Sequence, residues 1–72
     1  MAVEERRRAM IDRDRELWGI ALNVEHRHGS EGPMFIAGMI GKATMKGDPV
    51  GVALWREVAA RFGQLVAASN VA

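Results

Sequence analysis

The chain has 72 residues, of which 49% are hydrophobic and 26% are charged, with a formal net charge of +1 and no cysteine. This length allows one domain with a small core, and the lack of cysteine excludes disulfides and thiol chemistry. The near-neutral charge argues against a folded nucleic-acid-binding domain. The first residues carry charges without an apolar stretch, and no apolar run is long enough to span a membrane, so we expect a cytoplasmic protein.

Residues 1–11 (MAVEERRRAMI) form a charged N-terminal extension, which the sequence leaves as either helical or disordered. Asp12 or Asp14 is predicted to cap the first firm helix, because an aspartate oxygen accepts a free backbone N–H at a helix start. This helix is expected to run to about His28 and to end at Gly29. Its apolar stripe recurs at helical spacing and comprises Leu17, Ala21 and Val24, with Ile20, Trp18 and Leu22 beside it.

A second helix is predicted over Pro33–Lys46, with proline at a first-turn position where no backbone N–H is needed and Ser30 as its cap. Gly47, Asp48 and Pro49 then give a helix stop, an N-cap and a helix start in succession. The third helix is expected to run from Pro49 to Ala67 or Ala68.

These elements predict an all-α fold, a small three-helix domain with short Gly/Pro turns over residues 12–68. Two Leu-Trp pairs, Leu17-Trp18 and Leu54-Trp55, are expected to anchor the first and third helices in a shared core, with the second helix packed across them. Trp18, Trp55 and Phe62 form either part of this core or an aromatic platform for a ligand, and their helical spacing on apolar faces favours the core.

Glu25 and His28 are the best candidates for metal binding, because a helix places residues three apart on one side. Such Glu-x-x-His pairs form half-sites in di-iron bundles, but this chain has one pair, so only an oligomer completes the ligand set. The alternative is that His28 packs its ring under the following turn and donates a hydrogen bond to a backbone carbonyl. No nucleophile has a partner set, so the sequence predicts neither an enzyme nor a cofactor.

Met34, Gly38, Gly41 and Met45 lie off the main apolar stripe of the second helix. Two glycines in a short helix each cost roughly 1 kcal/mol relative to alanine, which is easiest to explain if another backbone approaches closely. Methionine-rich surface adapts to partners, so these residues predict a second contact, either within the chain or with another chain. The leading functional hypothesis is a non-enzymatic interaction module that acts through a helix face, as a homodimer or with a protein partner.

The alternative function is a small DNA-binding or transcription-accessory protein. The second and third helices would form a segment like a helix-turn-helix, and the N-terminal arginines would supply a basic arm. The near-neutral charge and the exposed Glu57, Ala53, Ala60 and Gln64 of the third helix weigh against phosphate contacts. The residues of this alternative are Arg6, Arg7, Arg8, Arg56 and Arg61.

Five short segments carry a resemblance to a known group of proteins. They are DRELW (14–18), VEHRHG (24–29), FIA (35–37), GD (47–48) and GVALW (51–55). In this pattern the chain resembles short uncharacterised alphaproteobacterial proteins that share a domain of unknown function, over about residues 12–65. The resemblance implies a small bacterial cytoplasmic protein and brings with it no activity, substrate or catalytic residue.

Overall fold

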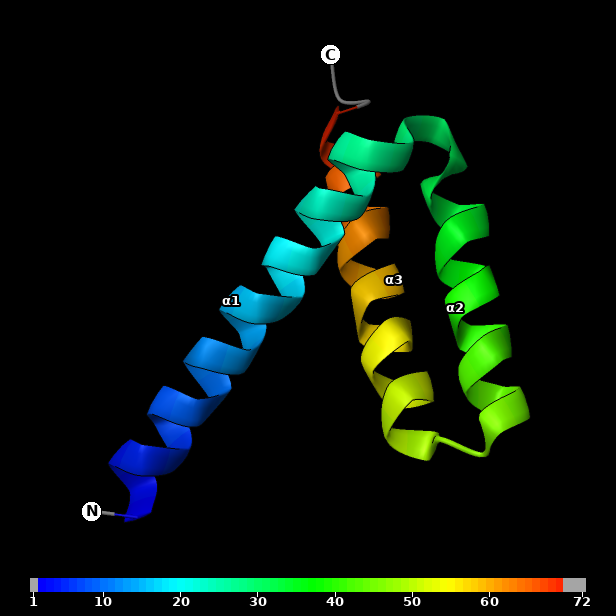
Figure 1. Ribbon diagram of the computed structural model, residues 1–72. Coiled ribbons are helices and arrows are strands. Elements are labelled where there is room, and N and C mark those ends of the chain that lie inside the picture. Colours follow the sequence, from blue (N-terminus) through cyan, green and yellow to red (C-terminus); the bar gives the residue numbers. More distant parts are fainter. Residues whose placement is uncertain (1, 70–72) are drawn as a thin grey trace.

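The computed structural model describes residues 2–69, which fold into three α-helices and contain no strand (Figure 1). Helix α1 covers Ala2–His28, α2 covers Gly32–Lys46 and α3 covers Pro49–Ser69, and a short 3₁₀ turn, η1 (Gly29–Glu31), joins the first two. The predicted all-α fold is confirmed. None of these helices is sufficiently long and apolar to cross a membrane.

Helix α1 starts about ten residues earlier than either predicted cap, so the prediction that Asp12 or Asp14 begins the helix is wrong. Both aspartates lie inside a continuous helix, because no glycine or proline interrupts the chain before Gly19 and a cap-preferring residue does not end a helix by itself. Residues 2–11 of the N-terminal extension therefore take the helical alternative, while residue 1 lies outside the described part of the chain.

The turn between α2 and α3 forms as its sequence predicts. Gly47 adopts the left-handed conformation with φ of 69°, which glycine reaches without steric cost. The Asp48 carboxylate accepts a hydrogen bond of 3.0 Å from the backbone N–H of Gly51, so Asp48 caps α3. At the other end of α2 the predicted Ser30 cap is wrong, since Glu31 holds the cap position and forms no side-chain capping bond there.

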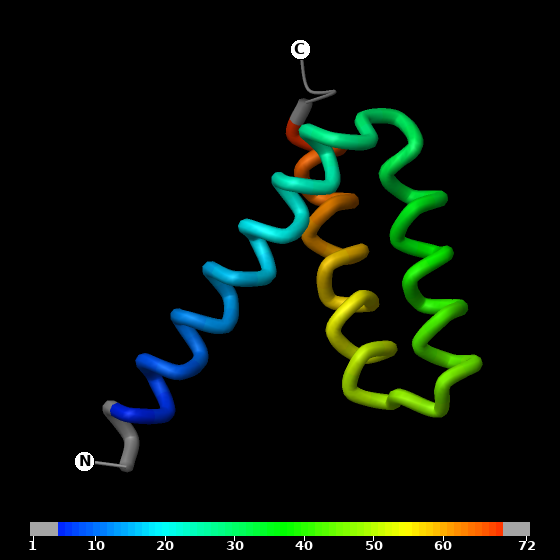
Figure 2. Tube along the Cα trace, viewed as in Figure 1, coloured from blue at the N-terminus to red at the C-terminus, as the bar shows by residue number. Residues whose placement is uncertain are grey.

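The three helices form a flat arrangement rather than a closed bundle. Helices α2 and α3 run antiparallel side by side, and α1 leans across α3 and diverges from it toward the N-terminus (Figure 2). The molecule measures 43 × 38 × 16 Å, and its thinnest dimension is little more than one helix diameter of about 10–12 Å. Helix α3 thus lies between the other two, whereas the sequence predicted that the second helix packs across both partners.

The core is a small cluster to which all three helices contribute, and Leu54, Trp55 and Phe35 are among the half-buried side chains packed around it. Leu17 is only 2% exposed, so the first predicted anchor is confirmed, and Phe62 is a core residue as the apolar pattern indicated. Trp18 is half-buried and is not among the described side chains packed on this cluster, so its predicted role as a core anchor is wrong. The buried cluster comprises Leu17, Ala21, Val24, Ile36, Val58 and Phe62.

Gly32 is the position in the core where any side chain would collide with a neighbour. A Cβ atom there would lie 2.7 Å from Cε2 of Phe62 and closer still to its Cζ. We expect Gly32→Ala to lower the free energy of unfolding by about 1–3 kcal/mol, because the Phe62 ring must move within a packed core. Urea unfolding followed by circular dichroism measures the change.

The matched control is Gly63→Ala, at an exposed glycine of α3 where a Cβ atom meets nothing within 4 Å among the described residues. This change should raise stability by up to about 1 kcal/mol, since alanine favours a helix over glycine. Equal stability of the Gly32→Ala variant and the original chain would contradict the contact with Phe62.

The Asp48 cap gives a second test of the fold. We expect Asp48→Ala to cost about 1 kcal/mol, because the N–H of Gly51 loses its acceptor at the start of α3. Asp48→Asn should retain most of the stability, since asparagine is an equally good cap. Thermal unfolding of the three chains measures this order, and a loss of equal size in both variants would show that the charge rather than the cap matters.

Candidate interaction surface

The side of α2 that faces away from α3 is apolar and uncovered. Met34, Gly38, Gly41 and Met45 follow one another at intervals of four, three and four residues, which places them along one side of the helix. We call these four residues the α2 outer face. Met34 is 79% and Met45 is 90% exposed, and a Cβ atom at Gly38 or Gly41 would meet nothing within 4 Å in the described part of the chain.

Of the two contacts predicted for these residues, packing within the chain is therefore wrong. Helix α1 packs mainly on α3 and does not cover the α2 outer face (Figure 1). The cost of Gly38 and Gly41, roughly 1 kcal/mol each relative to alanine, is thus not explained by any close approach within residues 2–69.

The α2 outer face offers van der Waals contact rather than polar chemistry. Lys42 is the one charged residue between positions 34 and 45. Thr44 is the one hydroxyl there, and it donates a hydrogen bond of 2.8 Å to the carbonyl of Ile40 in its own helix. The face therefore suits another apolar protein surface better than a polar or charged small molecule.

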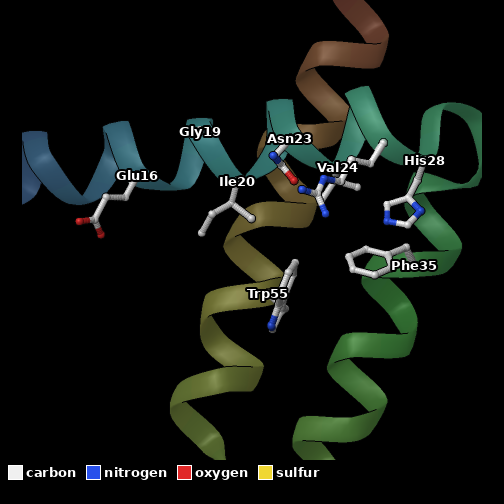
Figure 3. A pocket seen from close by; sticks show the side chains of 9 residues that line it. Glu16, Gly19, Ile20, Asn23, Val24, His28, Phe35 and Trp55 are labelled. Atoms are coloured by element: carbon white, nitrogen blue, oxygen red, sulfur yellow. The ribbon is translucent and has the colours of Figure 1, made fainter.

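A cleft of about 760 Å³ lies between α1, the start of α2 and the middle of α3 (Figure 3). Trp55 and Phe35 meet edge to face with ring centroids 6.0 Å apart, and Ile20 points from α1 toward Trp55. The lining contains no serine, threonine or cysteine, and so it lacks a side-chain nucleophile of those types. The residues that line it are Glu16, Gly19, Ile20, Asn23, Val24, Arg27, His28, Phe35 and Trp55.

His28 belongs to this cleft, where its ring stacks on Phe35 at a centroid distance of 4.1 Å and an interplanar angle of 17°. The ring packs at the turn, as one interpretation predicted, but against Phe35; the hydrogen bonds found within residues 2–69 include none from its ring to a carbonyl. The stack joins the end of α1 to the start of α2. This contact depends on the conformation of the turn between the helices, so the helical periodicity of the sequence did not predict it.

Glu25 and His28 are not joined by further ligands. Glu25 is exposed and does not line the cleft. In the described part of the chain no three or more histidine, aspartate or glutamate side chains gather where they could hold a metal ion. The pair alone supplies too few donors for a metal site of the kind the sequence suggested.

The arginines of the nucleic-acid alternative lie in different places. Arg6, Arg7 and Arg8 are exposed on the diverging part of α1, and Arg56 is exposed on α3. Helices α2 and α3 lie antiparallel (Figure 1), whereas the helices of a helix-turn-helix cross at about 90–120°. The α2–α3 pair therefore lacks helix-turn-helix geometry, and the N-terminal arginines lie on a different helix from Arg56 and Arg61.

Arg61 is occupied by contacts within the chain. Its Nη2 lies 2.7 Å from Oδ1 of Asp14, and its Nη1 donates a hydrogen bond of 3.1 Å to the carbonyl of Glu57. One turn away, Nη2 of Arg13 lies 2.8 Å from Oε2 of Glu57. These two ion pairs connect α1 to α3 at the point where the helices begin to diverge, and they help to fix the direction of α1.

The hydrogen bond from Arg13 lowers the pKa of the Glu57 carboxyl below its ordinary value, and the same contact raises the pKa of Arg13. A carboxyl with a lowered pKa in the folded chain stabilises the fold above its unfolded-state pKa, near 4.5, and loses that effect as the pH falls through the lower folded-state value. Since both groups are exposed, the effect is small and sensitive to salt.

We therefore expect the stability difference between the original chain and Glu57→Gln to be largest at neutral pH. It should shrink as the pH falls below 4.5, because Glu57 becomes protonated and resembles glutamine. Urea midpoints measured over this pH range test the pair. Glu25→Gln, at an exposed carboxyl of the same protein, is the control, and a Glu57→Gln effect that does not change with pH would contradict the assignment.

The fold and the surface together define a small all-α helical domain with an uncovered apolar helix face. Its sequence matches the model of a family of unknown function, DUF6961, over residues 13–70. The chain therefore belongs to the DUF6961 family. No curated protein and no solved structure matches the chain.

Proposed function

We propose that this protein is a non-enzymatic interaction module that binds a protein surface, of a second copy or of another protein, through the α2 outer face. The observation that carries the proposal is the exposure of Met34 and Met45, 79% and 90%, on the same side of one helix. Both ends of the face thus present a large apolar side chain to solvent, and the glycines between them leave the backbone accessible.

Physical magnitudes support a role in binding. Complete burial of a methionine side chain stabilises a contact by roughly 1.5–3 kcal/mol. Methionine is unbranched and adapts its shape to a partner, and glycine admits another backbone at short range. Burial of a face with these residues and few charges by a partner is therefore more favourable in free energy than burial of a typical solvated helix side, which is charged or polar.

The test is the substitution Gly38→Arg. We expect it to remove association, because a long charged side chain then stands in the middle of the α2 outer face. The fold should keep or gain stability, by up to about 1 kcal/mol, since arginine favours a helix over glycine and a Cβ atom at this position meets nothing within 4 Å among the described residues. Light scattering behind a sizing column measures self-association, and affinity capture from a lysate of the source organism measures other partners.

Gly63→Arg is the matched control, because it places the same side chain at an exposed helical glycine of α3. Association that survives Gly63→Arg but not Gly38→Arg supports the proposal. If Gly38→Arg leaves both self-association and capture unchanged, the α2 outer face is not the binding surface and the proposal fails.

A further inference from the structure

The chain exposes more surface than a compact monomer of its size. Its solvent-accessible surface is 5764 Å², whereas a compact protein of 7.9 kDa exposes about 4,400 Å². Its radius of gyration is 13.9 Å, against about 11 Å for a compact domain of this length. The surplus, roughly 1,300 Å², exceeds the area of about 800 Å² that each partner buries in a standard protein interface.

Part of this surplus belongs to the diverging half of α1, but that segment is highly charged. Residues 1–16 contain five arginines and five acidic residues, while residues 34–45 contain one charged residue, Lys42. On the outer side of α1, Ile11, Trp18 and Leu22 form an interrupted apolar stripe, because Arg15 and Glu25 share that side. A partner therefore covers the α2 outer face with less loss of charge solvation than the outer side of α1.

The order of residues on the α2 outer face is the same in both directions: methionine, glycine, glycine, methionine, at spacings of four, three and four. In an interface between two identical copies related by a twofold axis, residue i of one copy contacts residue j of the other, and residue j contacts residue i. The surface must therefore be complementary to itself. In an antiparallel pair centred between residues 39 and 40, Met34 lies opposite the partner's Met45. Gly38 then lies opposite the partner's Gly41.

We infer that the partner of the α2 outer face is a second copy of this chain, paired antiparallel along α2 about a twofold axis between residues 39 and 40. This inference rests on the proposed function and specifies its partner. The spacing of four and three residues is that of a coiled-coil seam, in which antiparallel helices pair a positions with d positions. The central glycines let the two helices approach closely, and the methionines close the seam at both ends.

Pairing along α2 also agrees with the shape of the molecule. One copy is 16 Å thick and has its small core in the seams between helices. Pairing along α2 joins two flat chains edge to edge. It leaves both copies of the diverging N-terminal part of α1 at a distance from the contact, since that part lies on the other side of α3 from α2 (Figure 2). The five arginines and five acidic residues of residues 1–16 then stay outside the contact and keep their solvation.

The experiment uses the absence of native cysteine. Full-length chains carrying Met34→Cys or Met45→Cys are oxidised separately and as a mixture, and covalent dimers are resolved by mass spectrometry. In the antiparallel pair the mixture forms a disulfide between unlike chains. Each variant alone forms little disulfide, because the same cysteine in the two copies is separated by eleven helical residues, about 16 Å along the axis. This distance is beyond the reach of a disulfide.

The controls separate specific contact from random oxidation and from a change in association. A mixture of Met34→Cys with Gln64→Cys, which places the second thiol on exposed α3, should give no more covalent dimer than either chain alone. Light scattering confirms that the cysteine variants associate as the original chain does. Adding Gly38→Arg to both partners should reduce formation of the unlike disulfide at least about tenfold, which corresponds to 1.4 kcal/mol.

The outcomes distinguish the inference from the proposed function. Disulfides within each single variant, but not preferentially in the mixture, would show a parallel pair and overturn the inference. A chain that is monomeric at all concentrations, yet captures another protein in a manner that Gly38→Arg abolishes, would also overturn it while the proposed function stands. A dimer that neither forms the unlike disulfide nor responds to Gly38→Arg would overturn both.

Discussion

The contact on which the fold depends is that between the Phe62 ring and the bare backbone of Gly32. Phe62 is 3% exposed in the core cluster, and the missing side chain at Gly32 lets the first turn of α2 rest directly on the ring. The same point therefore fixes where α2 starts, how closely it approaches α3 and which side of it is buried. Once Ile36 and Ala43 face inward, helical geometry directs Met34, Gly38, Gly41 and Met45 outward.

Local signals in the sequence were sufficient where one short segment determines the structure. The left-handed Gly47, the Asp48 cap and Pro49 act within a few residues, so both helix ends at that turn were predicted. The start of α1 was not, because Asp12 and Asp14 favour a helix start only if the preceding chain leaves the helix, and nothing in residues 2–11 makes it do so. The predicted core position of Trp18 was wrong for a related reason. The apolar arc of α1 is wider than the area that α3 covers, and helical periodicity alone does not show where the covered part ends.

The candidate surface could be predicted in composition but not in exposure. Met34, Gly38, Gly41 and Met45 stood apart from the main stripe of α2 in the sequence, yet whether α1 covers them is decided by contacts between distant residues. The core packs Leu17 of α1 with Val58 of α3 across 41 positions, and Arg13 meets Glu57 and Arg61 meets Asp14 across 44 and 47 positions beside it. No periodic pattern within one helix contains that information, and the cleft with the stack of His28 on Phe35 was missed for the same reason.

Folding and the proposed association of this chain use different sides of α2. Substitutions can therefore change the stability of the fold and the association separately. The inner side contributes Ile36 and Ala43 to the buried residues, so a change there alters stability first and binding only as a consequence. At Gly38 and Gly41 the relation is reversed, because a side chain at an exposed helical position favours the helix and meets no neighbour within residues 2–69. A substitution at these glycines therefore changes stability and association in opposite directions, and a loss of association there cannot be attributed to a damaged fold.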